Sequence, residues 1–459
     1  MIADLKPYAA YKDPGLPWLG QVPSHWDLIP NRGLVRRRKV LVGKRHSDYQ
    51  LLSLTKQGVI VRDISTGKGK FSADMGTSQE VRDGDLVFCL FDVPETPRTV
   101  GRSVHSGMIT GAYTVFESLD VSISEYFEQF YLAMDDRKLL SPLYSGLRNT
   151  IPAERFLGTK TPLPPPAERA AIVRFLGWAT GRLERAVRAK RKVIMLLTEQ
   201  KQAVINRAVT RGLDSSVSLK PSGIQWLGDI PGHWVVRRIK SVVSNVADQT
   251  TVMEDQDSYI ALEDVESWTG RVTPHRRLNE KLFTGQVKKY KTNDVLFGKL
   301  RPYLAKAITA SGTGVCSGEF LVLRADHSIV HPPYIEQLLR TKSTIDVITS
   351  STFGAKMPRA DWQFIGGLSV ALPPVSEQVQ ITESIQAATR PLVETITRYE
   401  REVDLLREYR TRLVADVVTG KLDVREAAAR LPEEVPLDTV EDAADLDEDL
   451  DIADGEATV

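Results

Sequence analysis

Residues that could do chemistry occur in this chain, but without the neighbours that enzymes need. A phosphate-cradling loop has a glycine, four intervening residues and then Gly-Lys. At three such pairs that first glycine is replaced, by Arg62, Asn293 and Ala415. The seven histidines and two cysteines form no set with metal-ligand spacing, and no Gly-x-Ser-x-Gly turn occurs. The sequence therefore predicts neither a metal site nor a catalytic nucleophile.

One motif comes closer to chemistry. His331-Pro332-Pro333-Tyr334 is similar to the loop with which adenine-N6 methyltransferases hold the target amino group. That loop begins with Asn, Asp or Ser, whereas this one begins with His, and no glycine-rich cofactor loop follows a strand elsewhere. We expect the two prolines to begin a helix that carries Ile335, Leu338 and Leu339.

Charge separates the chain into a basic body and an acidic end. The 459 residues carry a net charge of +1, but residues 431–459 hold 12 acidic and no basic side chains. Residues 1–430 therefore have 60 basic against 47 acidic side chains, a net charge of +13 that favours a polyanion as partner. The acidic end is expected to be disordered, with solubility favoured over DNA mimicry as its role. No apolar run reaches the ~20 residues that span a bilayer and no signal peptide is recognisable, so we expect a cytoplasmic protein.

The chain is a tandem duplication. Residues 15–26, Gly-Leu-Pro-Trp-Leu-Gly-Gln-Val-Pro-Ser-His-Trp, return at 223–234 as Gly-Ile-Gln-Trp-Leu-Gly-Asp-Ile-Pro-Gly-His-Trp, an offset of 208. Leu-Pro-Pro at 163–165 returns at 372–374, an offset of 209. Tyr126 and Tyr334 also correspond, so the tyrosine of the His-Pro-Pro-Tyr motif is expected on a helix that both copies share. Such constant offsets indicate two copies of one structural unit.

Each copy joins a diverged part to a long helix. Residues 16–160 and 224–370 are rich in Val, Ile, Thr and aromatic residues broken by Gly, Pro and Asp, which is typical of short strands with a few helices. Both helices follow a proline-rich turn, and their apolar residues recur every seven positions in two series, which is typical of a coiled-coil seam over about 40 residues. Glu168 and Glu377 place negative charge at the helix starts, and only the second helix has a good N-cap residue, Ser376. The seam positions are Leu176, Thr180, Leu183, Val187, Lys190, Ile194, Leu197, Lys201, Val204 and Ala208, and then Ile385, Thr389, Leu392, Ile396, Tyr399, Val403, Leu406, Arg410, Leu413 and Val417.

These elements predict an α+β protein with two mixed α/β domains in tandem pseudo-repeat, separated by two long helices packed as an antiparallel coiled coil. The alternative is a surface helix on each domain. The expected boundaries are residues 1–160 for the first domain, 161–214 for the first helix, 215–370 for the second domain, 371–425 for the second helix and 426–459 for the disordered tail.

Several segments resemble the specificity subunits of type I restriction–modification systems. They are the Trp-Leu-Gly…Pro-x-His-Trp opening, Phe-Gly-Lys-Leu-Arg-Pro-Tyr-Leu at 297–304 with Cys-Ser-Gly-Glu-Phe at 316–320, Leu-Pro-Pro-x-x-Glu-Gln at 372–378, the heptad helix, and Val-Thr-Gly-Lys-Leu at 418–422. The resemblance covers nearly all of residues 11–425, and the order and duplication of the motifs make it specific.

The resemblance implies a noncatalytic subunit that binds double-stranded DNA. Each of two target-recognition domains would read one half of a bipartite sequence, and the helices would set the length of the spacer. The subunit would bind two copies of an adenine-N6 methyltransferase subunit and, in the full assembly, translocating nuclease subunits. This chain would hold no cofactor, because S-adenosylmethionine would be bound by the methyltransferase partner.

DNA-binding candidates follow from the chemistry of the groove. Base edges are read by Arg, Lys, Asn and Gln, and phosphates are bound by Lys and Arg; the alternative for each candidate is a solvated surface charge. The first domain departs from the family pattern, with Cys-Leu-Phe-Asp at 89–92 where the second has Gly-Lys-Leu-Arg at 298–301. The candidates are Lys56, Lys68, Lys70, Arg98, Arg102, Arg148 and Asn149 in the first domain, with Lys68 and Lys70 expected to grip phosphate, and Lys299, Arg301, Tyr303, Lys306, Lys356 and Arg359 in the second.

Two alternatives from other functional classes remain. A stand-alone DNA methyltransferase would bind the cofactor itself, which the missing glycine-rich loop argues against. A protein-bridging scaffold would show no salt-dependent DNA affinity, whereas phosphate contacts make affinity fall as salt rises.

Overall fold

The computed structural model describes residues 5–62, 75–251, 258–273, 286–354 and 357–432. The chain divides into two compact units: unit 1 comprises Met1–Ala189 with Glu402–Val459, and unit 2 comprises Lys190–Arg401. Both division points fall inside a long helix. Each unit therefore contains part of α3 (Pro166–Arg211) and part of α7 (Val375–Val418).

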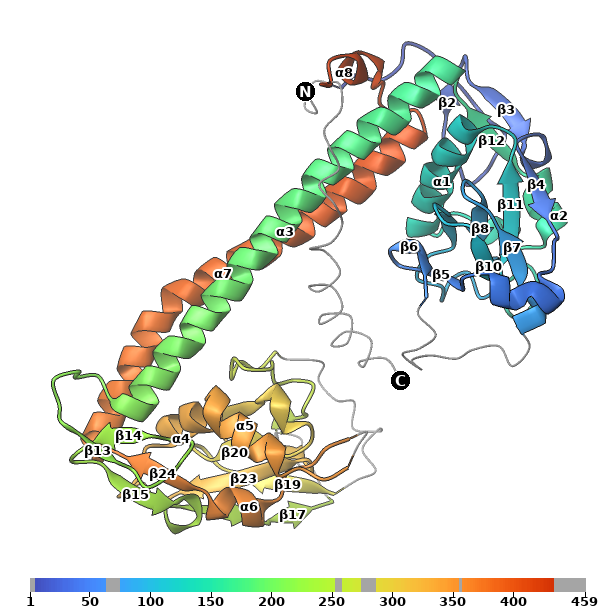
Figure 1. The fold of residues 1–459 in the computed structure, drawn as a ribbon. Coiled ribbons are helices and arrows are strands. Elements are labelled where there is room, and N and C mark those ends of the chain that lie inside the picture. The colour runs from blue at the N-terminus through green and yellow to red at the C-terminus, as the bar shows by residue number, and fades with distance from the viewer. Residues whose placement is uncertain (1–4, 63–74, 252–257, 274–285, 355–356, 433–459) are drawn as a thin grey trace. The chain divides into compact units, whose positions relative to one another are not determined.

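Unit 1 is built on a four-stranded antiparallel sheet in the order β4 (Val35–Arg38), β11 (Thr114–Ser118), β8 (Leu86–Phe88) and β9 (Val100–Arg102). Helix α1 (Val121–Asp136) packs against this sheet (Figure 1), because Tyr126, Phe127, Phe130 and Tyr131 recur at helical spacing and are fully buried. Other elements of unit 1 are β1 (Tyr11–Lys12), β2 (Val22–Pro23), β3 (Asp27–Pro30), β5 (Leu52–Thr55), β6 (Gly58–Val61), β7 (Gln79–Val81), β10 (Gly107–Ile109), α2 (Ala153–Gly158), β12 (Lys160–Leu163) and α8 (Arg425–Ala429).

Unit 2 has a central sheet of the same kind, in the order β16 (Val243–Val246), β23 (Phe320–Ala325), β20 (Val295–Gly298) and β21 (Ala307–Thr309). A second sheet has the order β17 (Gln249–Thr250), β19 (Val287–Tyr290), β22 (Gly314–Ser317) and β18 (Ser258–Ile260), with β18 and β22 parallel. Other elements of unit 2 are β13 (Leu219–Pro221), β14 (Asp229–Pro231), β15 (Val235–Arg238), α4 (Pro332–Leu339), α5 (Lys342–Ser350), α6 (Trp362–Gly367) and β24 (Ser369–Leu372).

The central sheets are duplicates of one another. In both, the strand that comes first in the chain stands at one edge, the last lies beside it, and the second and third follow in order. Helix α4 in unit 2 takes the place of α1 in unit 1, with Tyr334 buried where Tyr126 is buried. The His-Pro-Pro-Tyr motif is thus the start of a scaffold helix, as expected. The α+β class and the tandem pseudo-repeat are confirmed.

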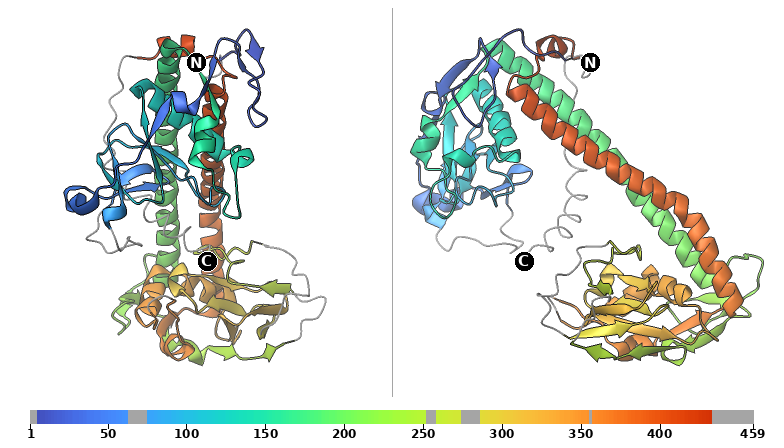
Figure 2. Two further views of the ribbon diagram at one scale, coloured as in Figure 1. Left: turned by 90° about the vertical axis from the view of Figure 1, so that its right-hand side faces the viewer. Right: turned by 180° about the vertical axis from the view of Figure 1, so that it is seen from behind.

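The long helices pack against each other in both units, as the heptad pattern predicts (Figures 1 and 2). In unit 1, Glu184 of α3 pairs with Arg410 of α7 at 3.1 Å. In unit 2, the ammonium of Lys190 on α3 lies 4.9 Å from the centre of the Tyr399 ring on α7. The first part of α3 meets the last part of α7 and the reverse, so the pair is antiparallel. Helix α7 begins at Val375, which places Ser376 inside the first turn; the expected N-cap role of Ser376 is wrong.

A carboxylate at the start of each helix holds the Trp-containing turn of its own domain. Glu168 accepts hydrogen bonds from Trp26 Nε1 at 2.7 Å and from the Tyr8 hydroxyl at 2.6 Å, and its second oxygen lies 2.8 Å from His25 Nε2. Glu377 accepts from Trp234 Nε1 at 3.0 Å in unit 2. The repeated Pro-x-His-Trp sequence is therefore a structural anchor.

The end of each helix holds the domain of the other repeat. In unit 1, the Tyr126 hydroxyl donates to the carbonyl of Val418, the last residue of α7, at 3.0 Å. In unit 2, the Tyr334 hydroxyl donates to Val209 of α3 at 3.0 Å. Each domain is thus clamped by the start of its own helix and the end of the other.

The chain after α7 also packs into unit 1. Ala427, Ala428 and Leu431 are buried in the same apolar cluster as Trp26, because helix α8 presents its small apolar residues to that cluster. The disordered tail predicted to begin at residue 426 is therefore wrong for residues 426–432. The rest of that tail lies outside the described residues.

Candidate nucleic-acid interface

A loop after β20 carries three of the six candidate residues of unit 2. Gly298 begins it, and a Cβ there would lie 2.8 Å from the end of the Leu262 side chain, which would have to shift. The loop is bonded to a hairpin: the Arg301 N–H donates to Pro358 O and the Ala360 N–H to Lys299 O, both at 2.8 Å. We call such a loop with its hairpin a loop–hairpin platform.

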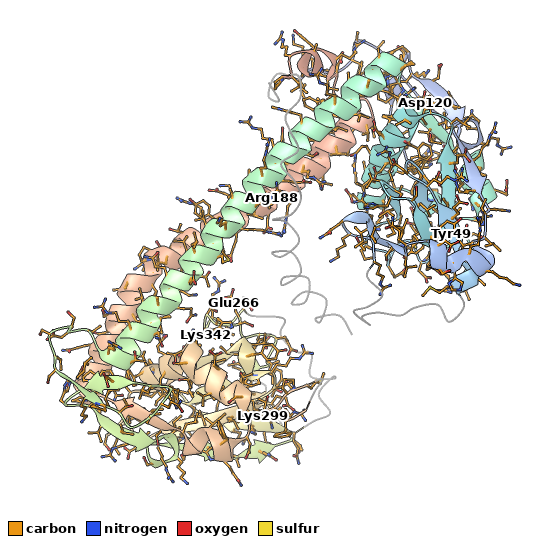
Figure 3. All side chains as sticks on the ribbon, in the orientation of Figure 1. Tyr49, Asp120, Arg188, Glu266, Lys299 and Lys342 are labelled. Atoms are coloured by element: carbon orange, nitrogen blue, oxygen red, sulfur yellow. The ribbon has the colours of Figure 1, made fainter. Side chains whose placement is uncertain are left out.

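The platform of unit 2 comprises residues 298–304 and the described residues of 353–360. It brings Lys299, Arg301, Tyr303 and Arg359 onto adjoining segments; Lys299 is half-buried and lies apart from Glu266 and Lys342 (Figure 3). Arg359 donates to Glu319 at 2.9 Å while its side chain stays 47% exposed.

Lys306 adjoins this platform but is engaged elsewhere. Its carbonyl accepts the Gly298 N–H, and its ammonium donates to Leu262 O at 2.8 Å. Burial lowers the pKa of Lys306. Its cation therefore has less freedom to reach a phosphate than that of Arg359.

Unit 1 repeats this platform with residues 89–97 and 145–151. The Asp92 N–H donates to Arg148 O at 3.0 Å and the Ile151 N–H to Leu90 O at 2.8 Å, matching the two bonds of unit 2. Asp92 and Arg301 are equivalent positions of the two repeats, and both have positive φ, 45° and 49°. The first domain thus keeps the backbone that its sequence had obscured, but it carries the opposite charge at this position.

Two candidates of unit 1, Arg148 and Asn149, lie in the hairpin of this platform. The Arg148 guanidinium is 73% exposed and pairs with the Asp92 carboxylate. Asn149 follows it in the hairpin with a φ of 43°, a left-handed conformation that asparagine tolerates better than most residues.

Arg98 and Arg102 are used mainly inside unit 1. Arg98 is 17% exposed, donates to Val100 O at 2.7 Å and pairs with Glu128 at 3.0 Å. Arg102 is 21% exposed, and its N–H donates to the same Glu128 carboxylate at 3.0 Å. These contacts join the segment around β9 to α1, which favours a structural role for the Arg98 guanidinium, whereas the Arg102 guanidinium has only a 3.9 Å ion pair with Glu125.

The other candidates are separate from these clusters. Lys56 is exposed in the turn between β5 and β6, where its carbonyl accepts an N–H from Arg98 at 3.2 Å. Lys68, Lys70 and Lys356 lie outside the described residues.

Exposed apolar side chains on the platforms escaped the sequence analysis. Leu147 stands in the hairpin of unit 1, and Phe353 and Met357 in that of unit 2. A search for charged and amide side chains passes over them. The available signal was an apolar residue next to a hairpin glycine, Gly146 or Gly354.

Comparison with known proteins bears on this arrangement. No protein-family model matches the chain. The specificity subunit of the type I restriction enzyme EcoDI from Escherichia coli is 22% identical over 261 residues, which are 53% of this chain and 58% of that protein. A chain from a structure described as the basis of complex assembly and conformational transition of the type I R-M system superposes over 87% of this chain and 99% of its own length, with a TM-score of 0.57 and 13% identity. This chain resembles a type I specificity subunit.

The HsdS subunit from Thermoanaerobacter tengcongensis covers 86% of this chain and 96% of its own length at 14% identity, with a TM-score of 0.40, too low to compare arrangements. The likeness to type I specificity subunits in sequence and fold confirms the resemblance drawn from the motifs. In the described part of the chain, no helix is long and apolar enough to cross a membrane. No group of three or more His, Cys, Asp or Glu residues there could hold a metal ion.

Proposed function

We propose that this chain is the noncatalytic DNA-recognition subunit of a type I restriction–modification complex and that it reads a bipartite duplex target with its two α/β domains. The observation that carries the proposal is the duplicated loop–hairpin platform. Its backbone bonds are the same in both units, but its side chains differ in charge, with Asp92 in one and Arg301 in the other. Two loop–hairpin platforms with the same backbone but different side chains could read two DNA segments of different sequence.

Electrostatics supports a duplex as the ligand. Residues 1–430 carry a net charge of +13. On the platforms, Arg148 and Arg359 keep much of their guanidinium groups at the surface, at 73% and 47% exposure. A basic surface attracts the duplex from a distance and releases its counterions on contact, so affinity should fall as salt rises.

The expected protein partners are two copies of a methyltransferase subunit, with translocating nuclease subunits in the larger complex. Leu196 on α3 and Leu405 on α7 are equivalent positions of the two repeats, are 51% and 56% exposed, and lie in different units. Met195 and Tyr409 are also exposed, at 46% and 41%, but at non-equivalent positions of the two helices. Exposed apolar residues on a helix suit a packing partner, and equivalent spots suit two copies of the same partner. S-adenosylmethionine would be held by these partners, in the cytoplasm.

Methylation mapping tests the function in the cell. N6-methyladenine is mapped across the genome by long-read sequencing, with the reading frame intact and deleted. The expected result is the loss of one bipartite methylated motif on deletion, which also reveals both half-sites. A chain that copurifies with an active methyltransferase but whose deletion leaves every methylated motif in place would contradict the proposal.

Purified chain separates the two alternatives. A stand-alone methyltransferase would bind S-adenosylmethionine without a partner, whereas the proposed subunit would not. A bridging scaffold would show no duplex affinity that changes with salt, whereas the proposed subunit would lose affinity linearly on a log–log plot.

A further inference from the structure

Each platform ends in a hairpin with exposed apolar side chains. In unit 1, Ser145 and Thr150 exchange two backbone hydrogen bonds of 2.9 and 3.0 Å, and Leu147 stands in the turn between them. The relative exposure of Leu147 is 105%, so the rest of the unit does not cover it. In unit 2, Phe353 exchanges bonds of 3.4 and 3.1 Å with Arg359, and Phe353 is 64% exposed.

A lone exposed leucine needs no explanation on a protein surface. Leu147 and Phe353 are not such isolated cases, because they occupy corresponding hairpins of two domains whose sequences have diverged. In both hairpins a cation stands close to the apolar residue: Arg148 follows Leu147, and Arg359 is the strand partner of Phe353. An exposed apolar side chain beside a cation does not pack within the protein. It would suit a DNA groove, where the apolar group meets the bases and the cation meets the bordering phosphates.

The hairpin of unit 1 is held firmly at its base. The Arg148 carbonyl accepts the Asp92 N–H, the Arg148 guanidinium pairs with the Asp92 carboxylate, and the Ile151 N–H is bonded to Leu90 O. A tip fixed in this way loses little conformational freedom when a ligand covers it.

We propose that the hairpin of each platform faces a groove of duplex DNA and that Leu147, in the turn of one hairpin, and Phe353, at the Phe353–Arg359 pair of the other, contact base edges, one in each half of the target. This inference rests on the proposed DNA-recognition function. The apolar group that a base presents in the major groove is the C5 methyl of thymine, so Leu147 and Phe353 would each favour a T·A pair at their position. Arg148 and Arg359 lie where they would contact phosphates, which orient a protein on DNA without specifying sequence.

Selection from random duplexes tests the inference with the full-length chain. Leu147→Ala and Phe353→Ala are compared with wild type, and Leu119→Ala serves as a matched control. Leu119 is 48% exposed and follows the end of β11 that lies opposite the platform, since Thr114 at the other end pairs with Phe88. The Leu147→Ala variant should lose a T·A preference in one half-site only, and Phe353→Ala in the other. Each should bind the wild-type duplex about tenfold more weakly, with an unchanged salt slope because no charge is lost.

The outcomes separate this inference from the function on which it rests. If wild type selects a bipartite sequence and both variants select the same one with equal affinity, Leu147 and Phe353 do not read bases and the inference fails alone. If wild type selects no sequence, the DNA-recognition function fails and the inference fails with it. A variant with a lower melting temperature than Leu119→Ala would be replaced by Leu147→Met or Phe353→Leu, which should restore most of the affinity.

Discussion

Single buried side chains attach the helices to the domains. Glu168 is 4% exposed and accepts hydrogen bonds from the buried side chains of Tyr8 and Trp26. Leaving a buried donor without an acceptor costs about 1–3 kcal/mol. Glu377 in unit 2 is 24% exposed, so water can replace part of what it provides. The anchor of unit 1 is therefore the more sensitive of the two.

The buried thiol of Cys316 makes stability depend on pH. Burial raises its pKa from the ordinary 9.0 to about 12, so the folded chain keeps this proton after the unfolded chain has lost it. The stabilisation is fully present below pH 9 and declines as pH rises toward 12. Between pH 8 and pH 10 the free energy of unfolding of unit 2 should fall by about 1 kcal/mol more in wild type than in Cys316→Ala. Urea unfolding at the two pH values measures this, and equal pH dependence in both proteins would contradict it.

At the scale of elements, the helix ends differ in how tightly they are packed. Gly212 after α3 and Gly420 after α7 both have a φ of 74°, which favours glycine. A Cβ on Gly212 would lie 3.3 Å from Glu377 and Trp234, whereas one on Gly420 would collide with the Pro23 ring and lie 3.1 Å from Trp26.

The two glycines form a matched pair for mutation. Gly212→Ala should destabilise unit 2 by about 1 kcal/mol, since its cost is mainly that of the left-handed backbone. Gly420→Ala should destabilise unit 1 by at least about 2 kcal/mol, because the Pro23 ring must also move. Chemical denaturation, with hydrogen exchange at each helix end as the readout, measures the change in free energy of unfolding of each unit. The opposite ranking would show that the close approach of Gly420 to Pro23 is not what limits this site.

Elements whose residues make repeated buried contacts could be predicted from the sequence. Three features are recognisable in both copies of the repeat: the Trp-containing turns, the tyrosines of α1 and α4, and the heptad seam. Each makes buried hydrogen bonds or packing contacts that a different residue would disrupt. The first platform could not be predicted, because its backbone is preserved by main-chain bonds that leave no trace in side-chain identity. The role of Arg98 was also hidden, since its partner Glu128 is distant in sequence and only the fold brings the two side chains together.

At the scale of the whole molecule, the prediction concerns the two long helices, which are expected to set the length of the DNA spacer between the half-sites. Removing residues 185–191 of α3 and 398–404 of α7 takes one heptad from each helix while keeping the seam in phase and leaving Leu196 and Leu405 in place. Seven residues of helix are about 10 Å, or about three base pairs of duplex. The recognised spacer should therefore shorten by about three base pairs while both half-sites stay the same, as methylation mapping would reveal. Changed half-sites with a constant spacer would contradict the role of the helices as a ruler.

The division of unit 1 between two distant stretches of chain has a consequence for synthesis on the ribosome. Unit 2 is one continuous stretch, Lys190–Arg401, so it can fold as soon as it has emerged. Unit 1 must wait for Val414, Val417 and Val418, which complete the cluster around Trp26 and Tyr126. At roughly 5–20 residues per second, synthesis of the stretch that separates the two parts of unit 1 takes about 10–40 s. The domain synthesised first is thus completed last, and during that interval its unfilled apolar surface is the part of the nascent chain most in need of a chaperone.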